Sequence, residues 1–205
     1  VHVYMNRKQY DLAMASLNKA VELNPSDPGT YSSRAGLYIL FKRYDLAIAD
    51  GTKALTIDPR HAPAYYNRGL AYVLLKKYDQ AIADFSAGLE INPQNSLYYY
   101  YRGYASASKE DYAAAIADYT KALELGATER DIYARRGWAY FELGEYEAAE
   151  NDFARQLAKY PRDASSYRGR GQVSEQKGQR ELAIADYSKV IEIDPQDAKA
   201  YCLRA

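Results

Sequence analysis

The sequence contains very little cysteine and histidine. Cys202 is the only cysteine among 205 residues, which excludes an intramolecular disulfide framework. The two histidines, His2 and His61, lie far apart in the sequence, and neither has the cysteine and histidine neighbours that a zinc site requires. We therefore expect both histidines to be solvated, Cys202 to be a free thiol, and the chain to hold no metal.

Net charge and long apolar segments are absent as well. The 27 basic and 27 acidic residues are interleaved and give a net charge of zero, whereas a protein that binds phosphate backbones needs a basic patch. No apolar run approaches the ~20 residues that span a bilayer, and no glycine-rich phosphate-binding loop is present. We therefore expect no nucleic-acid partner, no membrane span, no cofactor and no enzymatic site.

What the sequence does contain is a repeat with a fixed period of 34 residues. We name each repeat position after the residue of the template 62–95 that occupies it. The Gly69 position is glycine again in later repeats, at Gly103, Gly137 and Gly171. The Ala81 position is always alanine, at Ala13, Ala47, Ala81, Ala115, Ala149 and Ala183. No insertion or deletion interrupts the frame, and such a period indicates a stacked array in which each repeat contacts mainly its neighbours.

The spacing of residues predicts two helices in each repeat. In the first, Tyr65, Gly69 and Tyr72 follow one another at i, i+4 and i+7, which is one face of a helix. The second has small and apolar residues at four-residue intervals, and it ends before Pro93 because proline cannot sit in a helix interior. Residues 76–79 form the turn between the two helices. The repeat is thus predicted to be helix, short turn, helix and a loop marked by proline.

This pattern resembles the tetratricopeptide repeat along the whole chain. The residues that carry the resemblance in the template are Tyr65, Gly69, Tyr72, Tyr78, Ala81, Phe85 and Pro93. The resemblance implies an all-α fold, a right-handed superhelical solenoid of antiparallel helix pairs. It also implies a concave inner surface of the kind that commonly binds peptide segments.

We expect residues 1–205 to form a single array. It comprises a partial unit 1–27, full units 28–61, 62–95, 96–129, 130–163 and 164–197, and a partial unit 198–205. Arrays of this kind usually end in a polar capping helix, and none is apparent. We therefore interpret the sequence as a fragment of a longer protein, with stacking of its ends on another molecule as the alternative.

One pair of charges recurs from repeat to repeat. Arginine precedes the Gly69 position in every repeat that contains it, at Arg34, Arg68, Arg102, Arg136, Arg170 and Arg204. Aspartate recurs in the second helix, at Asp50, Asp84, Asp118, Asp152 and Asp186. Identical residues in every repeat cannot specify one position of a ligand, so we interpret the pair as a scaffold salt bridge rather than a ligand site. The pattern leaves open whether the bridge lies within a repeat or between neighbours.

The candidate binding residues lie on a different stripe of the first helices. Of the 23 tyrosines, six fall outside the scaffold positions, and four of those six are clustered at residues 98–104. This stripe is adjacent to the core-facing stripe on the same helices, and its residue types differ from repeat to repeat. The family resemblance implies that these side chains line the concave groove. The candidate groove residues are Tyr66, Asn67, Leu70, Tyr100, Tyr101, Tyr104, Arg135, Trp138, Phe141 and Arg168. The alternative is that the aromatic members only pack against neighbouring helices.

These observations predict a protein–protein interaction module that binds a peptide segment of a partner in an aromatic-lined groove. Rigid aromatic side chains beside arginine and asparagine are typical of binding hot spots. Two alternatives stay open. The chain could be an assembly scaffold that forms a homo-oligomer through the ends of the array, or it could be the adaptor domain of a larger enzyme.

Overall fold

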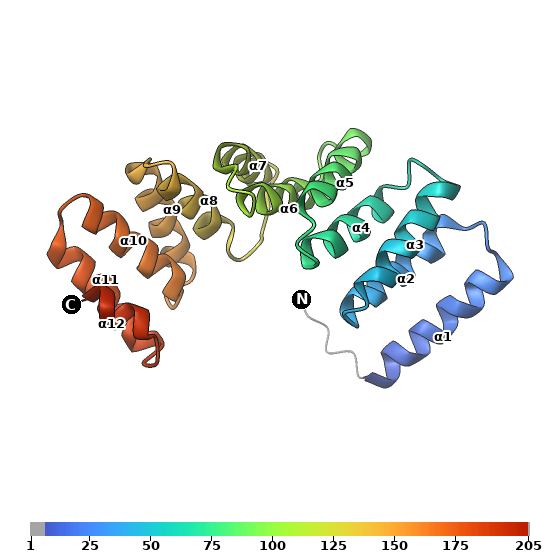
Figure 1. Cartoon of the computed structure of the whole chain (residues 1–205), viewed down its shortest axis with the longest axis horizontal. Helices are drawn as coiled ribbons and strands as arrows, with labels where there is room; N and C mark the ends of the chain where they lie inside the picture. Colours follow the sequence, from blue (N-terminus) through green and yellow to red (C-terminus); the bar gives the residue numbers. More distant parts are fainter. Residues whose placement is uncertain (1–6, 205) are drawn as a thin grey trace. The chain divides into compact units, whose positions relative to one another are not determined.

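The computed structural model describes residues 7–204, with side chains from residue 9 onward. Within that part the chain is all-α, with twelve helices and no strand (Figure 1). The partial repeat's first residues and His2 lie outside the described residues. The helices are α1 (Arg7–Leu23), α2 (Pro28–Leu40), α3 (Tyr44–Ile57), α4 (Ala62–Leu74), α5 (Tyr78–Ile91), α6 (Ser96–Ala107), α7 (Tyr112–Glu124), α8 (Ile132–Glu142), α9 (Tyr146–Lys159), α10 (Ala164–Gln176), α11 (Arg180–Ile193) and α12 (Ala198–Arg204).

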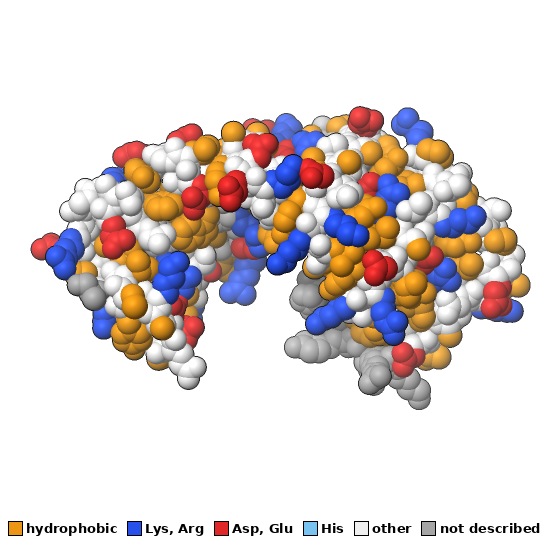
Figure 2. Space-filling view, viewed as in Figure 1, with side chains coloured by type: hydrophobic (Ala, Val, Ile, Leu, Met, Phe, Trp, Pro, Cys, Tyr) orange, Lys and Arg blue, Asp and Glu red, His pale blue; other side chains and the backbone are white. Residues whose placement is uncertain are grey.

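The chain folds as two compact units, Val1–Ala105 and Ser106–Ala205. In each unit consecutive helices pack as antiparallel pairs, and each pair packs on the next, as the period predicted. The boundary between the units falls inside α6 and therefore inside a repeat rather than between two repeats. Acidic and basic side chains are mixed over the face seen in Figure 2, as expected for a chain without net charge.

The turn within each helix pair has the same construction. The residue at the Lys76 position adopts a left-handed backbone, with φ between 58° and 76°, at Lys42, Lys76, Glu110, Gly144 and Gly178. The next N–H then donates to the carbonyl oxygen at the Tyr72 position, at 2.8 to 3.0 Å in each of these turns. This is the closure of a Schellman motif, which satisfies carbonyl groups at the helix end. Because the backbone makes this bond, serine can replace tyrosine at Ser106 and Ser174 without loss of the turn.

The glycine of the first helix makes room for an aromatic ring of the second. A Cβ atom added at Gly69 would lie 2.8 Å from Phe85 Cε1, and one added at Gly137 would lie 2.9 Å from Phe153 Cε1. Contacts below 3.0 Å are not tolerated by real Cβ atoms. Gly171 stands in the same relation to Tyr187. The small residue therefore accommodates a ring, and this packing holds the two helices of a pair in close contact.

The recurring Arg–Asp pairs lie within repeats, and their aspartates are buried. Arg68 donates from Nε and Nη2 to the two carboxylate oxygens of Asp84, at 2.8 and 2.7 Å. The same two-pronged pairing occurs in the other pairs described, Arg34–Asp50, Arg136–Asp152 and Arg170–Asp186. The third nitrogen reaches back to the preceding repeat, where Arg68 Nη1 donates to Thr52 Oγ1 at 3.1 Å. Arg34 and Arg136 make the equivalent third bond, to Asn18 and Thr120, so each of these three arginines joins three helices. Arg170 has Ala154 at that position of the preceding repeat.

Tyr98 is a core residue, although the sequence placed it outside the scaffold positions. Its side chain is 2% exposed, and its ring fills the space that Gly88 leaves on α5. Its hydroxyl donates to the backbone oxygen of Ala62 at 2.6 Å, which ties α6 to the start of α4. Burial raises the pKa of Tyr98 to about 12.

The raised pKa of Tyr98 predicts a loss of stability at alkaline pH. In the unfolded chain the phenol ionises at its ordinary pKa of about 10, so the unfolded state releases its proton first. The stabilisation is therefore complete below about pH 10 and is lost towards pH 12, a decrease of about 2–3 kcal/mol in the free energy of unfolding. Urea unfolding at pH 9 and pH 11.5 measures this decrease. Tyr98→Phe, which has no proton to lose, should show a smaller decrease; equal decreases in both proteins would contradict the assignment.

Candidate functional site

The predicted site residues of the first unit lie on α4 and α6. Tyr66 and Tyr101 are half-buried, and their rings meet nearly perpendicularly with centroids 5.8 Å apart. Tyr101 also stacks on the buried ring of Phe85 at 6.0 Å, and Tyr104 packs against the same core cluster. These packing contacts hold the rings in place while part of each remains accessible. Together with Asn67 and Leu70, both half-buried on α4, they form what we call the tyrosine surface: Tyr66, Asn67, Leu70, Tyr101 and Tyr104.

Tyr100 differs from its neighbours because it is only 7% exposed. Its ring lies 5.0 Å from the ring of Tyr101, in a nearly perpendicular arrangement. The structure therefore places Tyr100 behind the tyrosine surface, where its ring supports that of Tyr101. The sequence could not distinguish the two positions, because both lie on helix faces next to the core.

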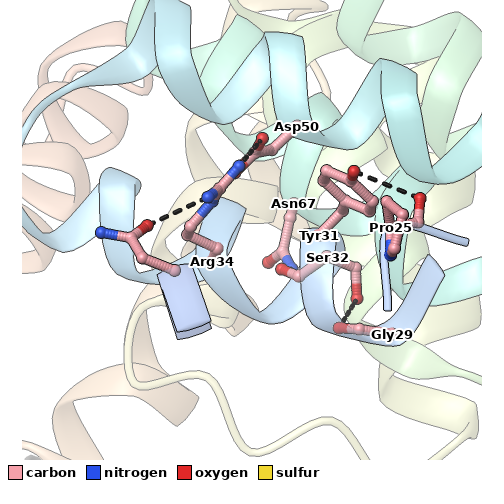
Figure 3. A network of polar contacts seen from close by, with 8 residues as sticks. Pro25, Gly29, Tyr31, Ser32, Arg34, Asp50 and Asn67 are labelled. Atoms are coloured by element: carbon pink, nitrogen blue, oxygen red, sulfur yellow. Dashed lines mark hydrogen bonds and ion pairs between the residues drawn. The ribbon is translucent and has the colours of Figure 1, made fainter. Parts of the chain in front are cut away.

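A polar network fixes Asn67 at the edge of the tyrosine surface. Its Nδ2 donates to the backbone oxygen of Ser32 on α2 at 2.8 Å, and Figure 3 shows the two side by side. The hydroxyl of Ser32 is in turn 3.0 Å from Nε2 of His61 and donates to the backbone oxygen of Gly29 at 3.3 Å. His61 is half-buried and hydrogen-bonded, so the expectation that it is solvated was wrong. The loop before α4 brings it back onto α2 of the same repeat, a contact that its sequence neighbours did not indicate.

Three predicted residues of the second unit, Arg135, Trp138 and Phe141, lie on α8. Trp138 is half-buried, with its ring 5.3 Å from that of Phe153 and 5.7 Å from that of Phe141. Its indole N–H donates to the hydroxyl of Ser165 on α10 at 3.1 Å. Arg135, one turn earlier, pairs with Asp131 at 2.7 Å. These contacts fix the orientation of the tryptophan.

Beside Trp138 the second unit has a hollow of about 270 Å³. We call it the tryptophan hollow. Its lining residues come from the end of α6, from α7 and from α8: Ala107, Tyr112, Tyr119, Arg135, Trp138, Ala139 and Glu142. Two of them were predicted site residues, Arg135 and Trp138; the other five were not. The hollow joins two consecutive repeats, and predicted residues contribute to its lining.

Three models of the tetratricopeptide repeat match the sequence, one over residues 62–95, one over 135–198, and one over 1–27 and 97–126. These ranges follow the same 34-residue frame as the helix pairs of the structure. The chain belongs to the tetratricopeptide repeat family. No curated protein sequence matches it significantly.

Solved structures of tetratricopeptide repeat proteins are similar over most of the chain. YrrB, described as a TPR protein with an unusual peptide-binding site, is 27% identical with a TM-score of 0.81, covering 91% of this chain and 96% of its own. PilF of Pseudomonas aeruginosa is 20% identical with a TM-score of 0.82, covering 97% and 90%. MamA is 23% identical with a TM-score of 0.75, covering 84% and 94%. Tetratricopeptide repeats serve as protein–protein interaction modules, and proteins of this fold are generally non-catalytic scaffolds.

Arg168 forms an ion pair with the last residue of its own repeat, directly before α12. It lies on α10 and pairs with Asp197, whose carboxylate also accepts the N–H of Ala200 at the start of α12. The pKa of Asp197 is lowered by this backbone hydrogen bond and by the charge of Arg168. Arg168 therefore contributes to the stacking of α12 in this tetratricopeptide array.

No group of three or more histidine, cysteine, aspartate or glutamate side chains within residues 7–204 is placed to hold a metal ion. No described helix has the length and apolar character to cross a bilayer. Cys202 is an exposed free thiol on α12.

Proposed function

We propose that the chain binds peptide segments of partner proteins at the tyrosine surface and at the tryptophan hollow. Both include first-helix positions that the family resemblance assigns to the ligand-binding groove. The observation that carries the proposal is that the aromatic rings are held rigidly by the core and yet remain partly accessible. Rigid tyrosine and tryptophan side chains lose little conformational entropy on binding, which is why they dominate binding hot spots.

The contacts suggest a division of roles within each surface. In the first unit, Tyr66, Leu70 and Tyr104 offer apolar area to a ligand, and the amide of Asn67 offers hydrogen bonds to a peptide backbone. In the second unit, Trp138 and Phe141 offer aromatic area and Arg135 a positive charge. In this proposal Tyr100 and Arg168 act behind the surfaces, since one is buried and the other is held by Asp197. We expect micromolar affinity, about −8 kcal/mol.

The likeness to YrrB supports this proposal, because that protein carries a peptide-binding site and is aligned over almost its whole length. An enzymatic alternative has no comparable observation in its favour.

Selection of random 12-residue peptides on the immobilised chain, followed by calorimetric titration of the enriched peptides, tests the proposal. We expect Tyr104→Ala or Trp138→Leu to weaken binding at least fivefold, which corresponds to about 1 kcal/mol for a hot-spot residue. Tyr160→Ala is the matched control, because Tyr160 lies at the C-cap of α9 and outside both surfaces; it should bind within twofold of the parent chain.

Two results would count against peptide binding. One is that no peptide is enriched over a blank surface; the other is that both variants bind like Tyr160→Ala. Light scattering on the same samples then examines the assembly alternative, because a mass that rises with concentration would indicate self-association instead.

A further inference from the structure

The tryptophan hollow exists because one side chain is small. Ala107 stands at the Val73 position, which holds a larger apolar residue in three of the other full repeats, Ile39, Val73 and Phe141, and glutamate, Glu175, in the fourth. Phe141 shows what such a residue does there, since its ring lies 5.7 Å from that of Tyr146 and fills the space above the following helix. Tyr112 occupies the position of Tyr146 in the repeat of Ala107. Without a large side chain at residue 107, the face of Tyr112 lines an open hollow.

The inner part of the hollow is lined by packed aromatic and alanine side chains. Tyr119 and Ala139 are fully buried or nearly so. Trp138 is fixed on one side by its hydrogen bond to Ser165 and by its ring contact with Phe153. The side chains that line the hollow are therefore already ordered before a ligand enters. This favours binding, because little conformational entropy is lost.

The size of the hollow suits one amino-acid side chain. Its 270 Å³ corresponds to about nine water molecules at ~30 Å³ each. It falls just below the range of about 300–1,000 Å³ that is usual for small-molecule and cofactor sites. A single large side chain of a peptide is the occupant that this volume accommodates.

The charges at the mouth are balanced. Arg135 lies on one side and is paired with Asp131, and Glu142 lies on the other. Burial and the neighbouring Glu142 and Glu110 raise the pKa of Tyr112, so the phenol is neutral at physiological pH. The mouth therefore has no excess of one sign that would attract a charged side chain into the hollow.

We propose that the tryptophan hollow is a specificity pocket that receives one large apolar side chain of the bound peptide, such as leucine, isoleucine, methionine or phenylalanine. Ala107 sets the size of that side chain. The inference rests on the proposed peptide-binding function and goes beyond it, because it states which residue class the ligand must carry and which residue of the chain selects it.

Filling the pocket tests the inference. In Ala107→Phe the new ring would take the place that Phe141 has over Tyr146, so we expect it to close the hollow. Peptides selected by the parent chain should share a large apolar residue at one position, and Ala107→Phe should bind them at least tenfold more weakly. At that position the variant should instead select glycine or alanine. Ala107→Val, which fills less space, should have an intermediate effect.

The matched control is Ala113→Phe, the same substitution at an exposed position of α7 outside the hollow. It should bind the parent's peptides within twofold. Circular dichroism and urea unfolding of all variants show whether the fold is kept; if Ala107→Phe fails to fold, the comparison is made with Ala107→Val and a threefold loss of affinity is expected.

The possible outcomes separate the two proposals. Peptides that bind the parent chain and the filled variants equally, with the same residue preference, would overturn the pocket while peptide binding stands. Selection of peptides with a charged or small residue opposite Trp138 would also overturn it. If neither protein enriches any peptide, the proposed function itself fails and the pocket with it.

Discussion

Arg136→Ala lowers the free energy of unfolding by about 3–5 kcal/mol, the cost expected when one partner of a buried ion pair is removed. The carboxylate of Asp152 is 1% exposed and accepts hydrogen bonds from Arg136 Nε and Nη2 at 2.6 and 2.9 Å. Burial by itself lowers the pKa of Arg136, but the hydrogen bond and the charge of Asp152 outweigh it and the pKa is raised. The variant leaves a charge buried without its partner. It also removes the bond from Nη1 to Thr120 of the preceding repeat.

The other repeats supply controls for this result. Arg170 makes the same pair with Asp186, but its side chain is 32% exposed, against 12% for Arg136. Arg170→Ala should therefore cost less, because water reaches the carboxylate that is left. The double variant Arg136→Ala/Asp152→Ala removes the unpaired charge and should recover part of the loss. Urea unfolding of the three variants decides the matter; a double variant less stable than Arg136→Ala would show that the buried charge is not the cause.

The scaffold of this chain could be predicted well from its sequence because the repeat multiplies each signal. A single Gly69 says little, but glycine or alanine at the same position in successive repeats identifies a close approach. The recurring arginine and aspartate likewise indicated a pair. The sequence could not show which aspartate each arginine contacts. The two residues are sixteen positions apart and lie on different helices, so the packing of those helices had to be known first. The sequence also held no sign of the third bond, by which Arg34, Arg68 and Arg136 each contact the helix before their own.

The candidate site was less predictable, because it depends on residues that do not repeat. Tyr98, Tyr100, Tyr101 and Tyr104 look alike in the sequence, yet Tyr98 and Tyr100 are buried and the other two are half-buried. The signal that separates Tyr98 from the rest was present in the sequence, in the form of Gly88 on the preceding helix, but only a known helix packing connects the two. The tryptophan hollow likewise depends on an alanine. The importance of this small residue becomes clear only when the structure shows that a larger residue at the equivalent position fills the space.

Gly88→Ala and Tyr98→Ala should each destabilise the chain strongly, and together they should cost less than the sum. A Cβ atom at Gly88 would lie 2.2 Å from Tyr98 Cε1, and the ring cannot move away easily because its hydroxyl is bound to the backbone of Ala62. Such overpacking costs about 1–3 kcal/mol. Tyr98→Ala removes a fully buried ring and leaves a cavity, at a cost of about 3–5 kcal/mol.

The double variant reproduces a pair that already occurs in this chain. In the preceding repeat the equivalent positions are Ala54 and Ala64, both fully buried in one cluster. With the ring removed, the new Cβ at residue 88 no longer clashes and the helix gains the higher propensity of alanine over glycine, about 1 kcal/mol. We therefore expect a coupling of about 1–3 kcal/mol in a double-mutant cycle measured by urea unfolding.

Gly36→Ala is the matched control for the glycine substitution. A Cβ there would lie 3.7 Å from Asn67 Nδ2, an ordinary contact, so this variant should gain about 0.5–1 kcal/mol from helix propensity alone. If Gly88→Ala is stabilising to the same degree, the ring of Tyr98 does not occupy the space that the structure gives it. If the decreases in the free energy of unfolding of the two single variants simply add, residues 88 and 98 are not energetically coupled. The complementary sizes of these two residues would then not contribute to the packing between repeats. The coupling thus decides whether neighbouring repeats of this array are interchangeable or are fitted to each other in pairs.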